Sequence, residues 1–295
     1  MRDFGVTARL VEAAGPLVVL FALLTQLGDL WFLALITLVP YWYGSALPRL
    51  GAAVDRERAA ILVALLFGAV ALLTTLKPIF GLPRPPGAGV PPRADLIPAA
   101  LEGLYAWLST GDGFGFPSGH ATGATLVFGG LAWALQVGSR RRRAAAAAGL
   151  VALVSLSRLV LGVHYLPDVL AGMAVGVTYL GVVLALGTPR RAFGLAAAVT
   201  LLGLPLVGAH TELLGALGVC VGGFAAWSVW GDRLLGDPTR AAGTATTLLG
   251  LATAGPLLAA VGEGLLGPWA SLAVGAVGGT LVVALPLVGQ RVAKK

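Results

Sequence analysis

About ten long apolar stretches, separated by short polar segments, limit the possible fold of this chain more than any other feature. A helix that crosses a bilayer needs about 20 apolar residues. The stretches are continuous rather than alternating, and helices satisfy their own backbone hydrogen bonds in lipid, so helices are favoured over membrane β-strands. We therefore expect an all-α, polytopic transmembrane helical bundle. The expected spans cover residues 11–27, 30–47, 59–76, 121–137, 144–161, 169–187, 192–209, 213–230, 241–261 and 268–288.

The composition agrees with a surface that faces lipid. The chain is 57% hydrophobic and 11% charged, whereas a soluble domain carries about 25% charged residues. Its net charge of +7 does not indicate nucleic-acid binding, because the basic residues fall between the apolar stretches. Cys220 is the single cysteine, so neither a disulfide within the chain nor a Cys/His metal cluster can form. We expect no metal and no cofactor.

The distribution of basic residues predicts the orientation. If the chain begins in the cytoplasm and each stretch crosses the membrane, 16 of the 20 Lys and Arg residues fall on the cytoplasmic side. This bias is typical of membrane proteins. The first stretch lacks a convincing cleavage site, so we interpret it as a retained helix. We expect a multi-pass protein of the cell membrane with both termini in the cytoplasm.

One long connection, residues 77–117, falls on the extracytoplasmic side in this topology. It begins rich in Pro and Gly, which predicts irregular structure. Further along, five apolar residues at helical spacing predict a short helix. This helix either lies on the outer membrane surface or packs against the other helices. The five residues are Ile97, Leu101, Leu104, Tyr105 and Leu108.

Polar residues gather at the extracytoplasmic ends of several apolar stretches. Lys77, Arg84 and Arg158 are three cations without an equal number of carboxylates near them in the sequence. Charged groups at membrane depth are costly and usually functional, and arginine and lysine both suit phosphate oxygens. A Pro-Ser-Gly-His run, residues 117–120, opens a helix whose free N–H groups favour an anion. The pattern indicates a site for a tetrahedral oxyanion.

Two histidines and one carboxylate supply reactive groups beside these cations. His164 and His120 can act as nucleophile or proton donor near neutral pH. Asp168 lies four residues after His164, in the first turn of the next expected helix. A carboxylate there can accept the ring N–H of a histidine and fix its tautomer. The other histidine can protonate the leaving oxygen.

These residues resemble the three signatures of the type 2 phosphatidic acid phosphatase superfamily, which also includes the vanadium haloperoxidases. Residues 77–85 fit Lys-x6-Arg-Pro, residues 117–120 are Pro-Ser-Gly-His, and residues 157–168 fit Ser-Arg-x5-His-x3-Asp. The resemblance covers roughly residues 55–190. It implies a metal-independent phosphatase with a phosphohistidine intermediate. By motif position, His164 is the nucleophile, Asp168 orients it and His120 protonates the leaving group.

The resemblance also implies which residues bind phosphate, namely Lys77, Arg84, Ser118, Gly119 and Arg158. We expect a six-span lipid phosphatase core in residues 1–191 and a four-span extension of unknown role in residues 192–295. The expected substrate is a phosphorylated lipid from the outer leaflet, with polyprenyl diphosphate favoured over phosphatidic acid and phosphatidylglycerol phosphate. A lipid phosphotransferase with the same site, and a non-enzymatic transporter or scaffold, remain as alternatives.

Overall fold

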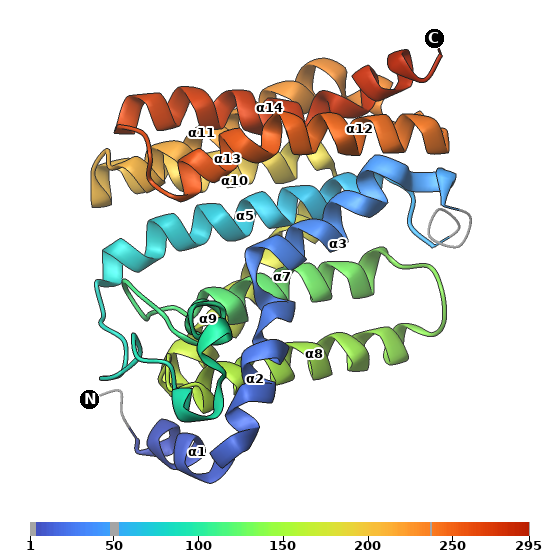
Figure 1. Cartoon of the computed structure of the whole chain (residues 1–295). Coiled ribbons are helices and arrows are strands. Elements are labelled where there is room, and N and C mark those ends of the chain that lie inside the picture. Colours follow the sequence, from blue (N-terminus) through green and yellow to red (C-terminus); the bar gives the residue numbers. More distant parts are fainter. Residues whose placement is uncertain (1–3, 48–52, 237, 295) are drawn as a thin grey trace.

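The computed structural model describes residues 4–47, 53–236 and 238–294, and within these ranges the chain is helical with no strand. The expected all-α polytopic bundle is confirmed (Figure 1). In chain order the α-helices are α1 (Val6–Ala14), α2 (Val18–Leu24), α3 (Leu30–Tyr43), α5 (Arg56–Phe80), α6 (Glu102–Ser109), α7 (Gly119–Ala134), α8 (Arg140–Val160), α9 (Leu166–Leu186), α10 (Pro189–Val207), α11 (Thr211–Leu234), α12 (Arg240–Ala252), α13 (Ala254–Gly262) and α14 (Pro268–Val292).

Every expected span coincides with a helix or with consecutive helices. Eight segments of the described chain are long and apolar enough to cross a membrane. The other two, α3 and α7, have 14 and 16 residues. At a rise of about 1.5 Å per residue, such helices reach only about 21–24 Å. They cross the hydrocarbon core only together with the segments that flank them.

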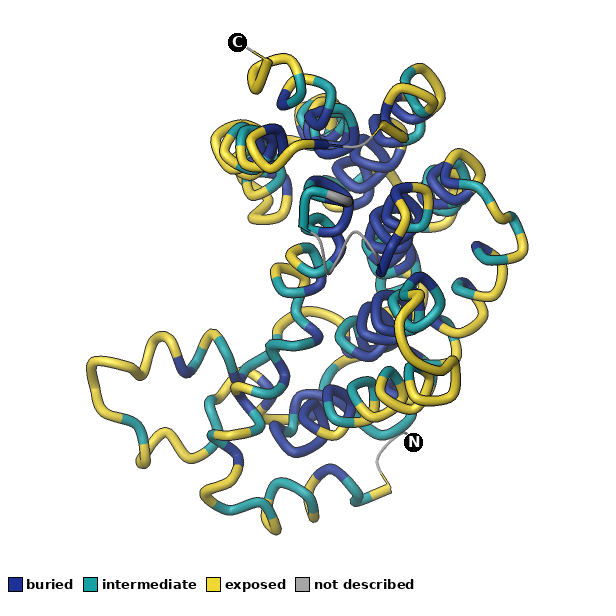
Figure 2. The backbone as a smooth tube through the Cα atoms, turned by 90° about the vertical axis from the view of Figure 1, so that its right-hand side faces the viewer, coloured by how far each residue is buried: buried dark blue, intermediate teal, exposed yellow. Residues whose placement is uncertain are grey.

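Helix α5 forms the centre of the bundle. It packs against α3, α7, α10 and α11, and most of its apolar stretch is buried. One hydrophobic cluster joins residues of α3 and α5 to residues of α10, α11 and α14. Figure 2 shows the buried residues gathered inside the bundle and the exposed ones along its outer faces. Residues 192–295 therefore share a core with the preceding helices, and the boundary at residue 191 stays a prediction.

Glycines bring α11 and α14 into close contact. A side-chain carbon on Gly218 or Gly222 of α11 would collide with the backbone of α14. A side-chain carbon on Gly275 or Gly279 of α14 would collide with the backbone of α11. Small residues at such positions let membrane helices approach through their backbones. This contact holds the extension together.

The bundle has two chemically different ends. We call the end where α5 finishes and α7 begins the site end, and the opposite end, where α5 begins and α7 finishes, the basic end. Arg56 Nε donates to the carbonyl oxygen of Leu234 at 2.8 Å, which joins the start of α5 to the finish of α11 at the basic end. Ten further cations of the described chain belong to helix termini at this end, namely Arg58, Arg140, Arg141, Arg142, Arg143, Arg190, Arg191, Arg233, Arg240 and Arg291.

The N-terminal segment takes a different course from the one expected. Residues 6–28 are long enough to cross a membrane, but the helix bends at Gly15, whose φ is +49°. The Thr7 hydroxyl donates to the carbonyl oxygen of His164 at 3.0 Å, and Asp29 lies beside His120. Both ends of this segment therefore contact the site end, and α3 continues to the basic end. The described chain begins at the site end and finishes at the basic end (Figure 1).

The helix expected within residues 77–117 is α6, and it packs against other helices. Tyr105 is buried in a cluster with Val18 and Ala22 of α2 and Val160 of α8. By contrast, Trp107 is 63% exposed. Leu101 and Leu104 of the expected apolar face are also exposed, and Tyr105 donates a hydrogen bond to the carbonyl oxygen of Pro92 at 2.6 Å within the same connection.

Candidate active site

The three polar segments singled out in the sequence meet at the site end. Lys77 lies in the last turn of α5, and Arg84 lies in the loop that follows. Ser118 is the N-cap of α7, so Gly119 and His120 open that helix. Arg158 lies in the last turn of α8. These elements begin or finish at one end of the bundle, which is the arrangement that helix counting predicted.

His164 is buried, with 1% of its surface exposed. It follows α8 in a short turn. Arg84 Nη1 lies 3.0 Å from His164 Nε2. Guanidinium groups donate hydrogen bonds and do not accept them, so Nε2 is the acceptor and carries the lone pair. The ring proton of the neutral imidazole is therefore on Nδ1.

Asp168 lies on the Nδ1 side of this ring. Its Oδ2 is 3.5 Å from His164 Nδ1, which is longer than an ordinary hydrogen bond. The same Oδ2 accepts the backbone N–H of Tyr165 at 3.0 Å, and this bond fixes the carboxylate at the start of α9. Both side chains are buried. The carboxylate is thus placed to hold the proton on Nδ1 and leave Nε2 unprotonated.

The long connection holds Arg84 in place. Arg84 Nε donates to the carbonyl oxygen of Asp112 at 2.6 Å, and Nη1 donates to that of Val163 at 3.0 Å. A side-chain carbon on Gly111 would meet the guanidinium at 2.8 Å, and one on Gly115 would meet the backbone of Arg84 at 3.2 Å. Two glycines therefore make room for this arginine, a role that the sequence pattern did not indicate.

Thr25 and Asp29 are two further neighbours of the site that the sequence motifs did not indicate. Arg158 Nη1 donates to the Thr25 hydroxyl at 3.1 Å. Asp29 Oδ2 lies 3.7 Å from His120 Nε2, with the two side chains 31% and 21% exposed. Neither residue belongs to a recognised motif. The only sequence signal was an acidic residue between two apolar stretches, which is also typical of an ordinary interfacial turn.

Several buried polar atoms around the site have no hydrogen-bond partner within the described part of the chain. They are Ser118 Oγ, His120 Nε2, Arg158 Nε and His164 Nδ1. Buried polar atoms normally find partners, since an unpaired one costs about 1–3 kcal/mol. All but the serine hydroxyl are nitrogens, and the hydroxyl can also donate. Apart from His164 Nδ1, which faces Asp168, these atoms and the N–H groups that open α7 form a cradle for an anion rich in oxygen.

The electrostatic environment keeps His164 neutral. Burial lowers the pKa of His164 well below its usual range, and the charges of Arg158, Arg84 and Lys77 lower it further. A neutral imidazole is the nucleophilic form. Within the described residues, no three His, Cys, Asp or Glu side chains are grouped to hold a metal ion.

The close approach of α9 to α7 completes the geometry. A side-chain carbon on Gly172 would collide with the carbonyl oxygen of Ser118, and one on Gly176 would collide with Thr125. These two glycines therefore form a packing surface between α9 and α7. The backbone N–H of Ser118 donates to the carbonyl oxygen of Asp168 at 2.9 Å. This bond ties the start of α7 directly to the start of α9.

Comparison with protein families matches residues 58–192 to the PAP2 superfamily. The matched segment begins near the start of α5 and finishes in α10, so it contains every site residue named by the three motifs. Asp29 and Thr25 lie outside it. Comparisons with curated proteins and with solved structures found no match.

Proposed function

Residues 58–192 match the PAP2 superfamily, which indicates phosphatase-type activity on phosphate esters, and on this premise we propose that the chain hydrolyses a lipid phosphate or lipid diphosphate at the extracytoplasmic membrane face. The reaction proceeds through a phosphohistidine on His164 and needs no metal ion. Protein cations supply the charge stabilisation that a divalent ion often gives in phosphoryl transfer.

In the first step, Nε2 of His164 attacks phosphorus and a P–N bond forms. The P–O bond to the leaving group breaks in line with this attack. His120 gives its proton to the departing oxygen, which avoids release of an unstable alkoxide. Arg84, Arg158 and Lys77 hold the remaining phosphoryl oxygens, with the hydroxyl of Ser118 and the N–H of Gly119. Asp168 stabilises the proton on Nδ1 as the ring gains positive charge.

In the second step, water attacks the phosphohistidine. His120, now neutral, takes a proton from this water as its oxygen bonds to phosphorus. The P–N bond breaks, inorganic phosphate leaves, and His164 returns to its neutral state. Both histidines regain their starting protonation, so the cycle is balanced. A lipid monophosphate gives a lipid alcohol, and a lipid diphosphate gives a lipid monophosphate.

The position of the site supports a lipid as substrate. The reactive groups lie at one end of apolar helices, so a head group can reach them while its tail stays in the membrane. The basic end carries most of the described cations, and the positive-inside rule assigns that end to the cytoplasm. The site end then faces the outer leaflet. Polyprenyl diphosphate is our first choice, followed by phosphatidic acid and phosphatidylglycerol phosphate.

One observation carries the mechanism: the 3.0 Å contact from Arg84 Nη1 to Nε2 of His164, with Asp168 on the opposite edge of the ring. It supports the proposal because Nε2 is then both unprotonated and next to a phosphate-binding cation. A catalytic nucleophile in phosphoryl transfer needs both properties.

The direct test uses the purified full chain with a panel of the three lipid phosphates and measures free phosphate. The wild type releases phosphate in excess EDTA and is inhibited by vanadate. With a ³²P-labelled substrate and rapid quenching, label appears on the protein in an acid-labile form. His164→Ala abolishes both label and turnover, whereas His210→Ala, a histidine at the start of α11, preserves them. Normal turnover by the His164→Ala variant rules out the proposed nucleophile.

A further inference from the structure

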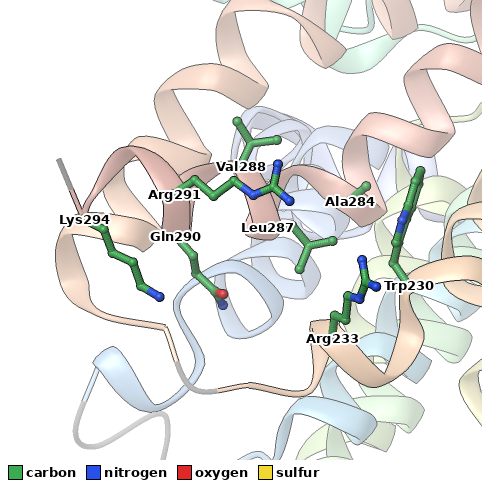
Figure 3. A pocket seen from close by; sticks show the side chains of 8 residues that line it. All are labelled: Trp230, Arg233, Ala284, Leu287, Val288, Gln290, Arg291 and Lys294. Carbon is green, nitrogen blue, oxygen red and sulfur yellow. The ribbon is translucent and has the colours of Figure 1, made fainter.

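A cationic pocket lies between the last turns of α11 and α14, at the basic end and far along the chain from the motifs. Its volume is about 360 Å³. Figure 3 shows side chains from both helices around one opening, with the charged ends of three of them directed toward it. The polar and aromatic residues that line it are Trp230, Arg233, Gln290, Arg291 and Lys294.

The three cations of this pocket lack compensating charge. Among the described residues that line it there is no carboxylate. Over the described ranges, the side chains of Arg233, Arg291 and Lys294 form no ion pair or hydrogen bond. Three cations facing one opening repel one another unless an anion lies between them. The pocket therefore favours a negatively charged occupant.

Gln290 gives a second, independent indication of a ligand. Its amide nitrogen, Nε2, is buried and has no hydrogen-bond partner in the part of the chain that the structure describes. Figure 3 shows this amide at the rim of the same opening as the cations. A buried donor normally finds an acceptor. Snorkelling toward the interface explains basic residues at a helix end, but it does not explain a hollow with a buried, unpaired amide donor.

The apolar side of the pocket suits the hydrocarbon chain of a lipid. Leu287 and Val288 line it, and Val288 is 44% exposed on the outer surface of α14. Val292, one turn further on, is 52% exposed. An acyl chain can run along this surface while a phosphate group sits among the cations. A free soluble anion would gain nothing from the apolar part.

We propose that this pocket binds the head group of an anionic phospholipid from the leaflet opposite the active site. The phosphate lies between Arg233 and Arg291, Gln290 donates to one of its oxygens, and Lys294 adds charge at the rim. The bound lipid bridges α11 and α14, which gives residues 192–295 a role in anchoring the bundle to anionic membrane. This site does not depend on the phosphatase reaction.

The test measures thermal unfolding of the purified full chain in mild detergent, titrated with phosphatidylglycerol, phosphatidylcholine or inorganic phosphate. We expect phosphatidylglycerol to raise the unfolding temperature more than the other two. A basic residue near an anionic lipid contributes about 1 kcal/mol, so Arg233→Gln with Arg291→Gln weakens the apparent affinity about 30-fold. The matched control is Arg141→Gln with Arg142→Gln, which removes two exposed cations of α8 at the same end.

A variant that keeps the charge separates a built pocket from general attraction. Gln290→Leu removes the amide donor without changing the net charge, and we expect about tenfold weaker binding of phosphatidylglycerol. The proposal is overturned if Gln290→Leu binds this lipid like the wild type, or if the Arg141 and Arg142 control loses as much affinity as the pocket variant. An equal effect of inorganic phosphate alone also overturns it, because the occupant is then a soluble anion.

Discussion

Nη1 of Arg84 lies 3.0 Å from Nε2 of His164, although 80 residues separate them in the chain. This contact assigns the ring tautomer, because the guanidinium can only donate. It also places a phosphate-binding cation against the proposed nucleophilic atom. Most of the predictions below concern this pair and the groups around it.

Removing the Arg84 charge has two expected effects. Arg84→Gln lowers kcat/KM about 10²–10³-fold, because a donor to the phosphoryl oxygens is lost. It also removes one of the charges that lower the pKa of His164. That pKa then rises, and the loss of activity on acidification begins at a higher pH than in the wild type. The pH profile of kcat/KM measures both effects. If the acid limb of the pH profile lies at the same pH in Arg84→Gln and in the wild type, the assigned contact between Arg84 and His164 is wrong.

The wild-type enzyme should stay active in mild acid. Burial and three cations lower the pKa of His164 well below its ordinary value of about 6.5. The neutral, nucleophilic ring therefore persists as the pH falls through 6.5. In the unfolded chain the same ring takes up a proton near pH 6.5, so its contribution to folding stability decreases below that pH. Activity that is half lost at pH 6.5 through protonation of His164 would be incompatible with this burial.

Asp168→Asn tests the partner on the other edge of the ring. The amide can still accept the N–H of Tyr165, so the start of α9 keeps its hydrogen bond. It no longer stabilises positive charge on the ring, and we expect kcat to fall about 10²–10⁴-fold. Phosphohistidine trapping shows whether formation of the intermediate is the slowed step. Full activity of a correctly folded variant would remove Asp168 from the mechanism.

Burial and the cations Arg158, Arg84 and Lys77 lower the pKa of His120 well below its usual range. The Asp29 carboxylate lies 3.7 Å from Nε2, and we expect its negative charge to act against this shift and favour the protonated ring. Asp29→Asn should lower activity about fivefold to tenfold on the basic side of the pH optimum and move the basic limb of the profile to lower pH.

The matched control for this change is Asp95→Asn. Asp95 is an exposed carboxylate paired with Arg93 in the long connection. Its removal should leave the pH profile unchanged. An equal decrease in activity at every pH would assign Asp29 a structural role only.

The course of the N-terminal segment can be tested by labelling. In a Cys220→Ala background, single cysteines replace Arg9, Asp95 or Lys294, all of which are exposed. Because Thr7 contacts His164, we expect Arg9→Cys and Asp95→Cys to react with an impermeant reagent from the same side of the membrane. Lys294→Cys should react from the opposite side. If the cysteines at positions 9 and 294 react from one side, α1 does not lie at the site end.

The sequence alone determined the type of fold and the location of the chemistry. Apolar stretches about 20 residues long have few alternatives to helices in lipid, and each lies where a helix is found. Counting the apolar stretches also predicted that His120 and His164 lie at the same end of the bundle. Every second connection between spanning helices lies on the same side of the membrane. The match of residues 58–192 to the PAP2 superfamily agrees with the motifs.

Only the tertiary structure decided where the N-terminal segment lies and which residues outside the motifs surround the site. Its apolar length fits a complete crossing, but the bend at Gly15 and the hydrogen bond of Thr7 return it to the site end. The contacts of Asp29 and Gln290 likewise depend on neighbours that are distant in the chain. Local patterns fix the helices, because backbone hydrogen bonding and hydrophobicity act over short separations. Which side chains face one another across helices follows from packing, which no short-range pattern encodes.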